Sequence, residues 1–187
     1  MGSWFRGLKV AAILTAVIWF IEIVNGFLGH ALNDFGIYPR ELRALPGVLF
    51  WVFLHGSFQH LVMNTMPLIV MGSFVALKGT LRFFIVTLII TILGGMGVWC
   101  FCREAYHVGA SGLVFGYFGY LVALGIYERS LQTLFIASLI IFYYGGMIFG
   151  ILPGEKFISW EAHLFGLFAG VLAARYFAMR YLKENVL

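Results

Sequence analysis

The chain carries the sequence Gly109-Ala110-Ser111-Gly112 directly ahead of an apolar run at residues 113–127. The two glycines allow the backbone to turn sharply and to approach its neighbours closely. A helix that begins at Ser111 or Gly112 directs free N–H groups and the positive end of its dipole toward the serine, which suits an oxyanion. The alternative is a simple helix cap, because serine is a favoured N-cap residue and glycine is common between packed membrane helices.

The composition is that of an integral membrane protein. Hydrophobic residues make up 62% of the 187 residues and charged residues only 11%, whereas soluble domains are about half apolar and about a quarter charged. The length leaves room for about six spans of about 20 residues each. No polar stretch is long enough for a separate soluble domain, so we expect one membrane domain over residues 1–187.

Hydropathy and turn residues predict an all-α membrane bundle of six spans. The predicted spans are 9–28, 58–77, 82–101, 112–127, 131–151 and 161–181. The first resembles a signal peptide, but it is long, carries Glu22 and lacks a clear cleavage site. The fourth is short, because about 15 residues at about 1.5 Å each cover roughly 23 Å of a core of about 30 Å. One end of the fourth span must therefore lie below the membrane surface.

The basic residues predict which end is submerged, because cytoplasmic loops carry an excess of Lys and Arg. The two terminal segments with the second and fourth loops hold eight of the 12 basic residues, and the other three loops hold four. We therefore expect both termini in the cytoplasm and Ser111 beneath the outer surface. The basic residues form no patch, so the net charge of +4 does not indicate a nucleic-acid partner.

The first loop, at about residues 29–57, is the longest connection and contains an apolar stretch at residues 45–54 that is too short to span. We expect an interfacial segment that lies partly in the outer leaflet, with Trp51 in the headgroup belt. Cys100 and Cys102 are too close in sequence for an easy disulfide and lack the partners of a metal site, so we interpret them as packing residues. We expect neither a metal nor another cofactor.

Small residues recur at helical spacing on the fourth and sixth spans. In the sixth span Gly166 and Gly170 follow His163 on one face, and such a stripe lets another helix approach closely. The fourth span carries a matching stripe, which consists of Gly112, Gly116 and Gly119. If the two stripes meet, His163 comes within reach of Ser111.

His60 and Asn64 lie at the outer end of the second span, four residues apart and therefore on one helical face. Each polar residue taken singly can be an interhelical hydrogen bonder, but intramembrane polar residues are costly and suggest function. Together they predict a serine hydrolase site, with His163 as general base toward the Ser111 hydroxyl. The Ser111 N–H and the side chains of His60 and Asn64 would hold the oxyanion. Glu161 points away from the histidine, so we expect a dyad.

These motifs closely resemble those of the rhomboid intramembrane serine proteases. They are residues 109–112, the pattern His55…His60…Asn64 before them, and Ala162-His163-x-x-Gly166-x-x-x-Gly170 after them. The resemblance extends over essentially the whole chain as a six-helix core with an outer-leaflet first loop. It implies that Ser111 is the nucleophile, that His163 is its base, and that His60 and Asn64 are the oxyanion groups. It also implies that the fifth span and fifth loop gate the lateral access of substrates.

Two departures from the family pattern leave the reactive groups in place. Phe115 stands where many relatives carry a tyrosine, which keeps the aromatic face near His163 but loses a hydroxyl. A Trp-Arg pair that many relatives carry in the first loop is absent, so the details of that loop do not transfer.

Three functions compete on this sequence. The favoured one is an endopeptidase, embedded in membrane lipids, that cleaves transmembrane segments of other proteins near their outer ends. The second is a non-catalytic relative that binds membrane clients, but such relatives typically lack Ser111, His163 or both. The third is a small channel or transporter with a histidine relay or metal site, which the absence of a His-Glu-x-x-His pattern weakens.

Overall fold

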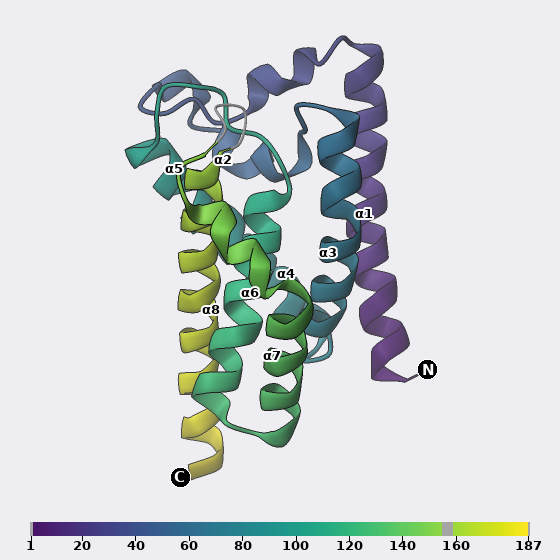
Figure 1. Ribbon diagram of the computed structural model, residues 1–187, viewed down its shortest axis with the longest axis vertical. Helices are drawn as coiled ribbons and strands as arrows, with labels where there is room; N and C mark the ends of the chain where they lie inside the picture. Colours follow the sequence, from purple (N-terminus) through teal and green to yellow (C-terminus); the bar gives the residue numbers. More distant parts are fainter. Residues whose placement is uncertain (1, 155–158, 187) are drawn as a thin grey trace.

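The computed structural model of the protein describes residues 2–154 and 159–186, which fold into a helical bundle (Figure 1). Six helices in these residues are long and apolar enough to cross a membrane, which confirms the predicted all-α fold with six spans. The helices are α1 (Ser3–Phe27), α2 (Gly47–Phe50), α3 (Phe58–Ala76), α4 (Thr80–Ile89), α5 (Gly95–Phe101), α6 (Ser111–Glu128), α7 (Leu131–Tyr144) and α8 (Trp160–Val186). A π-helical turn (Ile90–Gly94) joins α4 to α5 into the third span, and a 3-10 helix (Gly145–Ile151) extends α7.

The short helix α6 stands in the centre of the bundle, among α3, α4, α7 and α8 (Figure 1). Most of its residues are buried, as expected for a helix surrounded by other helices. Its 18 residues cover about 27 Å at about 1.5 Å per residue, which is still less than a hydrocarbon core of about 30 Å. Figure 1 shows α6 beginning below the loops at one end of the bundle, so its first residue, Ser111, is recessed.

Glycines bring α6 and α8 into backbone contact. A Cβ atom at Gly166 would overlap the carbonyl oxygen of Gly112, and one at Gly170 would overlap the carbonyl oxygen of Gly116. A Cβ at Gly119 would lie 2.6 Å from the carbonyl oxygen of Leu167. The predicted contact between the two small-residue stripes is therefore confirmed, and it holds the first turns of α6 and α8 side by side.

The first loop does not span, as predicted, but the expected position of Trp51 in a headgroup belt is wrong. Short helical turns occupy the apolar part of this loop, and Trp51 within it is fully buried. Its indole N–H donates to the carbonyl oxygen of Thr91 at 3.1 Å, in the π-helical turn. Its ring lies against Gly112, where a Cβ atom would overlap it. The Trp51 N–H is therefore satisfied inside the protein, and the indole ring packs the first loop against the start of α6.

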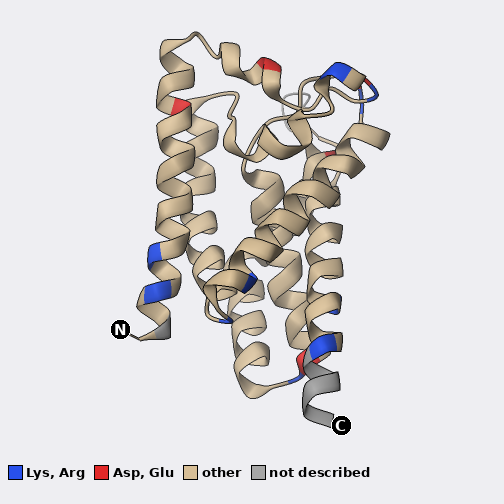
Figure 2. Ribbon diagram, turned by 180° about the vertical axis from the view of Figure 1, so that it is seen from behind, with Lys and Arg blue, Asp and Glu red and all other residues tan. Residues whose placement is uncertain are grey.

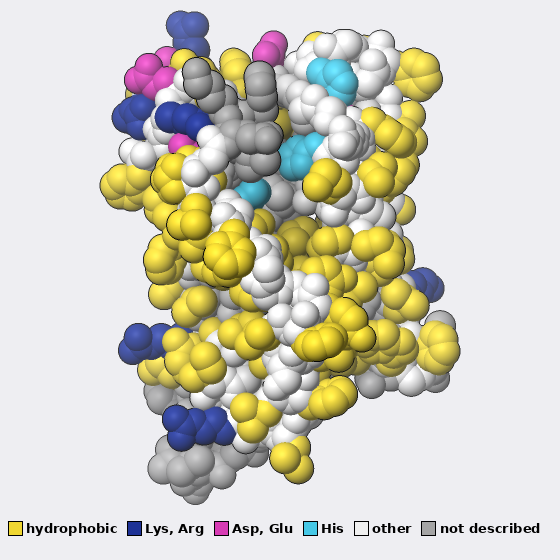
Figure 3. Space-filling model, in the orientation of Figure 1, with side chains coloured by type: hydrophobic (Ala, Val, Ile, Leu, Met, Phe, Trp, Pro, Cys, Tyr) yellow, Lys and Arg dark blue, Asp and Glu magenta, His cyan; other side chains and the backbone are white. Residues whose placement is uncertain are grey.

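Both chain ends lie at the same end of the bundle, next to turns of α1 and α8 that carry basic residues (Figure 2). On the face shown in Figure 3, hydrophobic side chains cover the middle of the molecule, and the charged side chains lie mostly toward its upper and lower parts and at its edges. This arrangement matches a protein that crosses the hydrocarbon core with its charges near the two surfaces.

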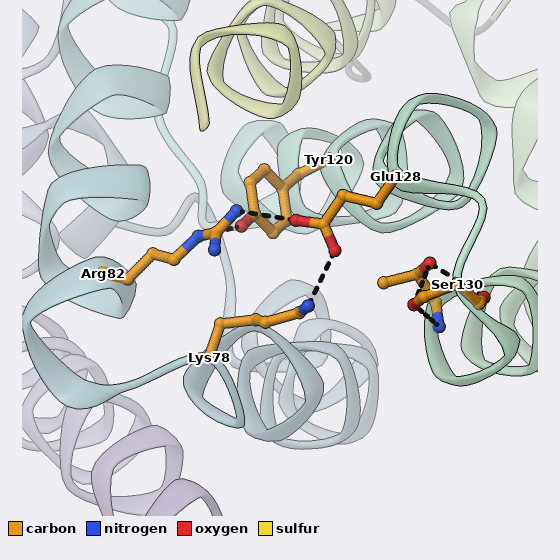
Figure 4. A network of polar contacts seen from close by, with 6 residues as sticks. Lys78, Arg82, Tyr120, Glu128 and Ser130 are labelled. Carbon is orange, nitrogen blue, oxygen red and sulfur yellow. Dashed lines mark hydrogen bonds and ion pairs between the residues drawn. The ribbon is translucent and has the colours of Figure 1, made fainter. Parts of the chain in front are cut away.

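A carboxylate is buried at the end of the bundle that holds the termini. Lys78 Nζ lies 2.7 Å from Glu128 Oε2, and Arg82 Nη2 lies 3.3 Å from Glu128 Oε1 (Figure 4). Arg82 Nε also donates to the Tyr120 hydroxyl at 2.8 Å, and the guanidinium lies over the ring of Phe177. The Glu128 carboxylate therefore forms ion pairs with two basic side chains. The contacts of Arg82 also connect α4 to α6 and α8. The sequence pattern alone had indicated only a basic loop here.

The buried acid in α1 is also paired. Glu22 Oε2 accepts a hydrogen bond from Asn25 Nδ2 at 3.2 Å, and its Oε1 lies 3.6 Å from His30 Nδ1. Asn25 in turn bonds Asn33 at 3.0 Å. Glu22 therefore belongs to a polar cluster that joins the C-terminal turns of α1 to the first loop.

Both cysteines are free thiols. Cys102 is buried in the core, and burial raises the pKa of its thiol to about 12. The thiol therefore stays protonated at neutral pH and is a poor nucleophile, which fits the interpretation as a packing residue.

Candidate active site

The first residue of α6 and the first turn of α8 form a serine–histidine pair. His163 Nε2 lies 2.9 Å from Ser111 Oγ, and His163 Nδ1 lies 2.8 Å from the carbonyl oxygen of Gly150. A carbonyl oxygen only accepts hydrogen bonds, so Nδ1 carries the proton of the neutral imidazole. The lone pair of Nε2 therefore faces the serine hydroxyl, which is the tautomer that a general base needs.

Phe115 and Gly150 hold the ring of His163 in place. Phe115 stacks on it with 4.2 Å between ring centres and 4° between planes, so the aromatic face expected at this position is present. Gly150 approaches from the 3-10 helix, where a Cβ atom would lie only 2.9 Å from the Phe115 ring. Glu161 instead lies 3.5 Å from Arg103 Nε. The group that orients the histidine is the backbone carbonyl of Gly150, and the catalytic dyad itself stays a prediction.

The backbone before the serine rules out the helix-cap alternative. Ala110 is the N-cap residue of α6, and Ser111 is already inside the helix with its hydroxyl bonded to His163. Gly109 has φ +134°, a conformation that residues with a side chain rarely adopt. Its N–H donates to the carbonyl oxygen of Trp51 at 2.9 Å. Gly109 therefore makes the turn that places Ser111 at the start of α6, where backbone N–H groups have no partner within the helix.

His60 and Asn64 flank the serine from α3. A Cβ atom at Gly109 would lie 2.6 Å from His60 Cε1 and 3.5 Å from Ser111 Oγ, so the imidazole and the hydroxyl share one small space. Asn64 is buried, and its Nδ2 lies 3.3 Å from the Nε2 atom of His55. An amide nitrogen has two hydrogens, so this contact leaves a second donor on Asn64. The structure therefore gathers all four predicted site residues at one end of the bundle.

His55 belongs to the sequence pattern, but its role was not predicted. It is fully buried, and its Nε2 accepts from the backbone N–H of Ala110 at 3.3 Å as well as facing Asn64. Burial, with a smaller contribution from His60, lowers the pKa of His55 to about 3. The imidazole is therefore neutral at all ordinary pH values, and it joins Asn64 to the turn that carries Ser111.

No sequence motif indicates that the Gly150 carbonyl is the partner of His163. Gly150 lies 13 residues before the histidine, in a stretch without a motif. The only available signal was the run of glycines at 145, 146 and 150, which permits an irregular backbone at the end of a span.

Comparison with known proteins identifies the family. Residues 43–180 match the Rhomboid domain. The uncharacterized protein Rv1337 of Mycobacterium tuberculosis is 37% identical over 180 residues, which cover 91% of this chain and 75% of that protein. The uncharacterized protein ML1171 of Mycobacterium leprae is 34% identical over 91% of this chain and 71% of its own length. The putative rhomboid protease YdcA of Bacillus subtilis is 31% identical over 125 residues, 65% of this chain and 61% of that protein. With six membrane-spanning helices, a matching domain and these relatives, the chain is an integral multi-pass membrane protein and belongs to the rhomboid family.

Proposed function

We propose that this protein is an intramembrane serine endopeptidase that hydrolyses peptide bonds in or near the transmembrane segments of other membrane proteins. The observation that carries the proposal is the 2.9 Å contact between Ser111 Oγ and a His163 imidazole whose other nitrogen faces a carbonyl oxygen. This arrangement fixes the base in the tautomer that accepts the serine proton. A client-binding relative needs no such arrangement.

The reaction follows from the positions of these groups. His163 Nε2 takes the proton of Ser111 as its oxygen attacks the carbonyl carbon of the scissile bond. The imidazolium then gives that proton to the leaving amine as the C–N bond breaks, which leaves an acyl group on the serine. A water molecule, deprotonated by the same imidazole, releases the acid and restores the hydroxyl.

The oxyanion of each tetrahedral intermediate would be bound by the Ser111 N–H, the second donor of Asn64 and the imidazole of His60. The helix start supplies unpaired N–H groups and a positive dipole end. His55 holds the Asn64 amide and the Ala110 N–H in place before substrate arrives. Such preorganised donors stabilise negative charge without a reorganisation cost during the reaction.

Substrates are transmembrane segments that unwind locally, because a helix hides its carbonyl groups. Segments with Gly, Pro or other weak helix formers near the outer boundary are therefore preferred. Access from the lipid would pass α7, whose outward side chains are largely exposed, among them Leu131, Phe135 and Phe142. Part of the fifth loop expected to act in this gating, residues 155–158, lies outside the described residues.

A serine-directed fluorophosphonate probe tests the proposal directly. Purified protein in detergent is expected to take the label on Ser111, because the base and the oxyanion donors activate that hydroxyl toward phosphorus as they do toward a carbonyl. Peptide mass spectrometry locates the label. A client-binding relative or a channel stays unlabelled, so absence of label from folded wild-type protein would refute the proposal.

The orientation proposed from the basic residues has its own test. Asp34→Cys and Leu131→Cys place single exposed thiols at opposite ends of the bundle, in a background without Cys100 and Cys102. An impermeant thiol reagent is expected to label the cysteine at 34 in intact cells, and the cysteine at 131 only after the membrane is opened. The reverse pattern would place the serine on the cytoplasmic side.

A further inference from the structure

A second histidine–serine contact lies beside the candidate site, and the proposed mechanism does not use it. His107 Nδ1 lies 2.6 Å from Ser159 Oγ, and His107 Nε2 lies 3.0 Å from the carbonyl oxygen of Arg103. Since the carbonyl accepts, Nε2 carries the proton and Nδ1 accepts from the serine hydroxyl. His107 is buried, and burial lowers the pKa of its imidazole, so the ring is neutral at pH 7 and Nδ1 keeps its lone pair.

The serine of this pair directly precedes α8, the helix that carries His163. Ser159 Oγ accepts from the Ala162 N–H at 3.3 Å, as an N-cap side chain does, and the Ser159 carbonyl accepts from the His163 N–H at 3.3 Å. One hydroxyl thus donates to His107 and accepts from the helix backbone. This hydroxyl therefore connects His107 directly to the start of α8.

The histidine of the pair belongs to the segment that carries Ser111. His107 is locked into the loop before α6 by its bond to Arg103, and it forms a β-bridge with Ile37 of the first loop. Its N–H donates to the Ile37 carbonyl at 2.8 Å, and its carbonyl accepts from the Ile37 N–H at 3.2 Å. A second tie between the same two segments is the ion pair of Arg103 and Glu161 at 3.5 Å.

His107 and Ser159 each lie the same number of residues before a residue of the proposed dyad. Ser111 is four residues after His107, and His163 is four residues after Ser159. The glycine contacts of α6 and α8 fix how far apart the two helices lie, but two helices at a fixed separation can still slide or rotate. The His107–Ser159 bond joins the loop before α6 to the residue before α8, which restricts sliding and rotation close to the reacting atoms.

We propose that His107 and Ser159 are positioning residues, which set the 2.9 Å approach of the His163 imidazole to the Ser111 hydroxyl. This inference rests on the proposed proteolytic function. Neither residue contacts the substrate. Their effect is on the geometry of the dyad, and misplacement of a reacting group by about 1 Å costs about 100-fold in rate.

The test compares paired variants on a fluorogenic transmembrane peptide in reconstituted bilayers. His107→Ala and Ser159→Ala each remove the bond and are expected to lower kcat by about 10- to 100-fold, with KM changed by less than about twofold. His107→Asn keeps an acceptor near the Nδ1 position, and Ser159→Thr keeps the hydroxyl, so both should recover most of kcat. The double alanine variant should be no slower than the slower single variant, because both remove one shared contact.

Ser130→Ala is the matched control for the loss of a helix cap. Ser130 Oγ accepts from the Thr133 N–H at 3.2 Å at the start of α7, as Ser159 does for α8, but it has no contact with the site residues in the described structure. Thermal unfolding of all variants is measured in parallel. The control should lose stability comparably and keep its kcat.

Three results overturn the inference: wild-type kcat in both alanine variants, an equal fall of kcat in Ser130→Ala, or losses that add in the double variant. If His107→Ala does not fold, the comparison of Ser159→Ala with Ser159→Thr tests the inference. The first variant removes the hydroxyl that bonds His107, and the second keeps it. An inactive, unlabelled wild-type protein contradicts the proposed function instead, so the two failures are distinguishable.

Discussion

Ser111→Ala is expected to abolish cleavage of a transmembrane substrate by the purified, reconstituted protein. The substitution removes the only hydroxyl that faces the His163 Nε2 atom among the described contacts. His163→Ala should have the same effect, because the hydroxyl then has no acceptor for its proton. Removal of the nucleophile or base of a soluble serine protease costs roughly 10⁴-fold or more in kcat, and a loss of that size is expected here.

The two losses should not add, because the serine and the histidine work as one unit. The double variant should be about as slow as either single variant. Ser73→Ala is the matched control, since Ser73 is another buried serine in a spanning helix and its hydroxyl donates only to the Ile69 carbonyl, at 2.6 Å. Cleavage by Ser111→Ala above a trace of the wild-type rate means that another residue is the nucleophile.

Gly170→Ala should have the second largest effect, on both activity and stability. A methyl group at this position overlaps the carbonyl oxygen of Gly116, so α6 and α8 must move apart. Overpacking of this kind costs about 1–3 kcal/mol in free energy of unfolding. Because the same two helices carry Ser111 and His163, we expect kcat to fall by about 100-fold. Gly166→Ala, which meets the carbonyl oxygen of Gly112, should behave alike.

The matched control for this substitution is Gly26→Ala. Gly26 lies inside α1, and a Cβ atom there would have no neighbour within 4 Å. Alanine is favoured over glycine in a helix by about 1 kcal/mol, so the control should be at least as stable as the wild type and equally active. The comparison separates the effect of the clash between α6 and α8 from the effect of alanine on helix propensity. Wild-type rates in both Gly166→Ala and Gly170→Ala contradict a need for close helix approach.

Regular spacing explains how much of this structure could be predicted from the sequence. The apolar runs predicted all six spans, and the first span begins at Ser3 instead of residue 9 because basic residues near the chain end still fit into helical turns. The stripe of His163, Gly166 and Gly170 predicted which helices touch, because helical periodicity converts residue numbers into a face. The placement of Ser111 beside His163 followed from that contact.

The contacts that sequence reasoning missed join segments without a repeating pattern. The carbonyl of Gly150 is a backbone group, so no residue type marks it as the partner of His163. His107 and Ser159 are single polar residues 52 positions apart, and only the folded loops bring them together. Trp51 was misplaced for a related reason: a tryptophan suits a membrane interface or a core with a free carbonyl, and only tertiary structure supplies the carbonyl of Thr91.

The contact of α6 with α8 also limits which second mutations can rescue a substitution in this chain. At Gly97 a new methyl group would meet the ring of Phe165, a side chain that a second mutation can shorten. At Gly166 and Gly170 the obstacle is a carbonyl oxygen of the main chain, which every amino acid carries. A second mutation that shortens a neighbouring side chain therefore cannot relieve this clash. We therefore expect activity lost through Gly166→Ala or Gly170→Ala to return by reversion to glycine, and not by a smaller side chain at a neighbouring position.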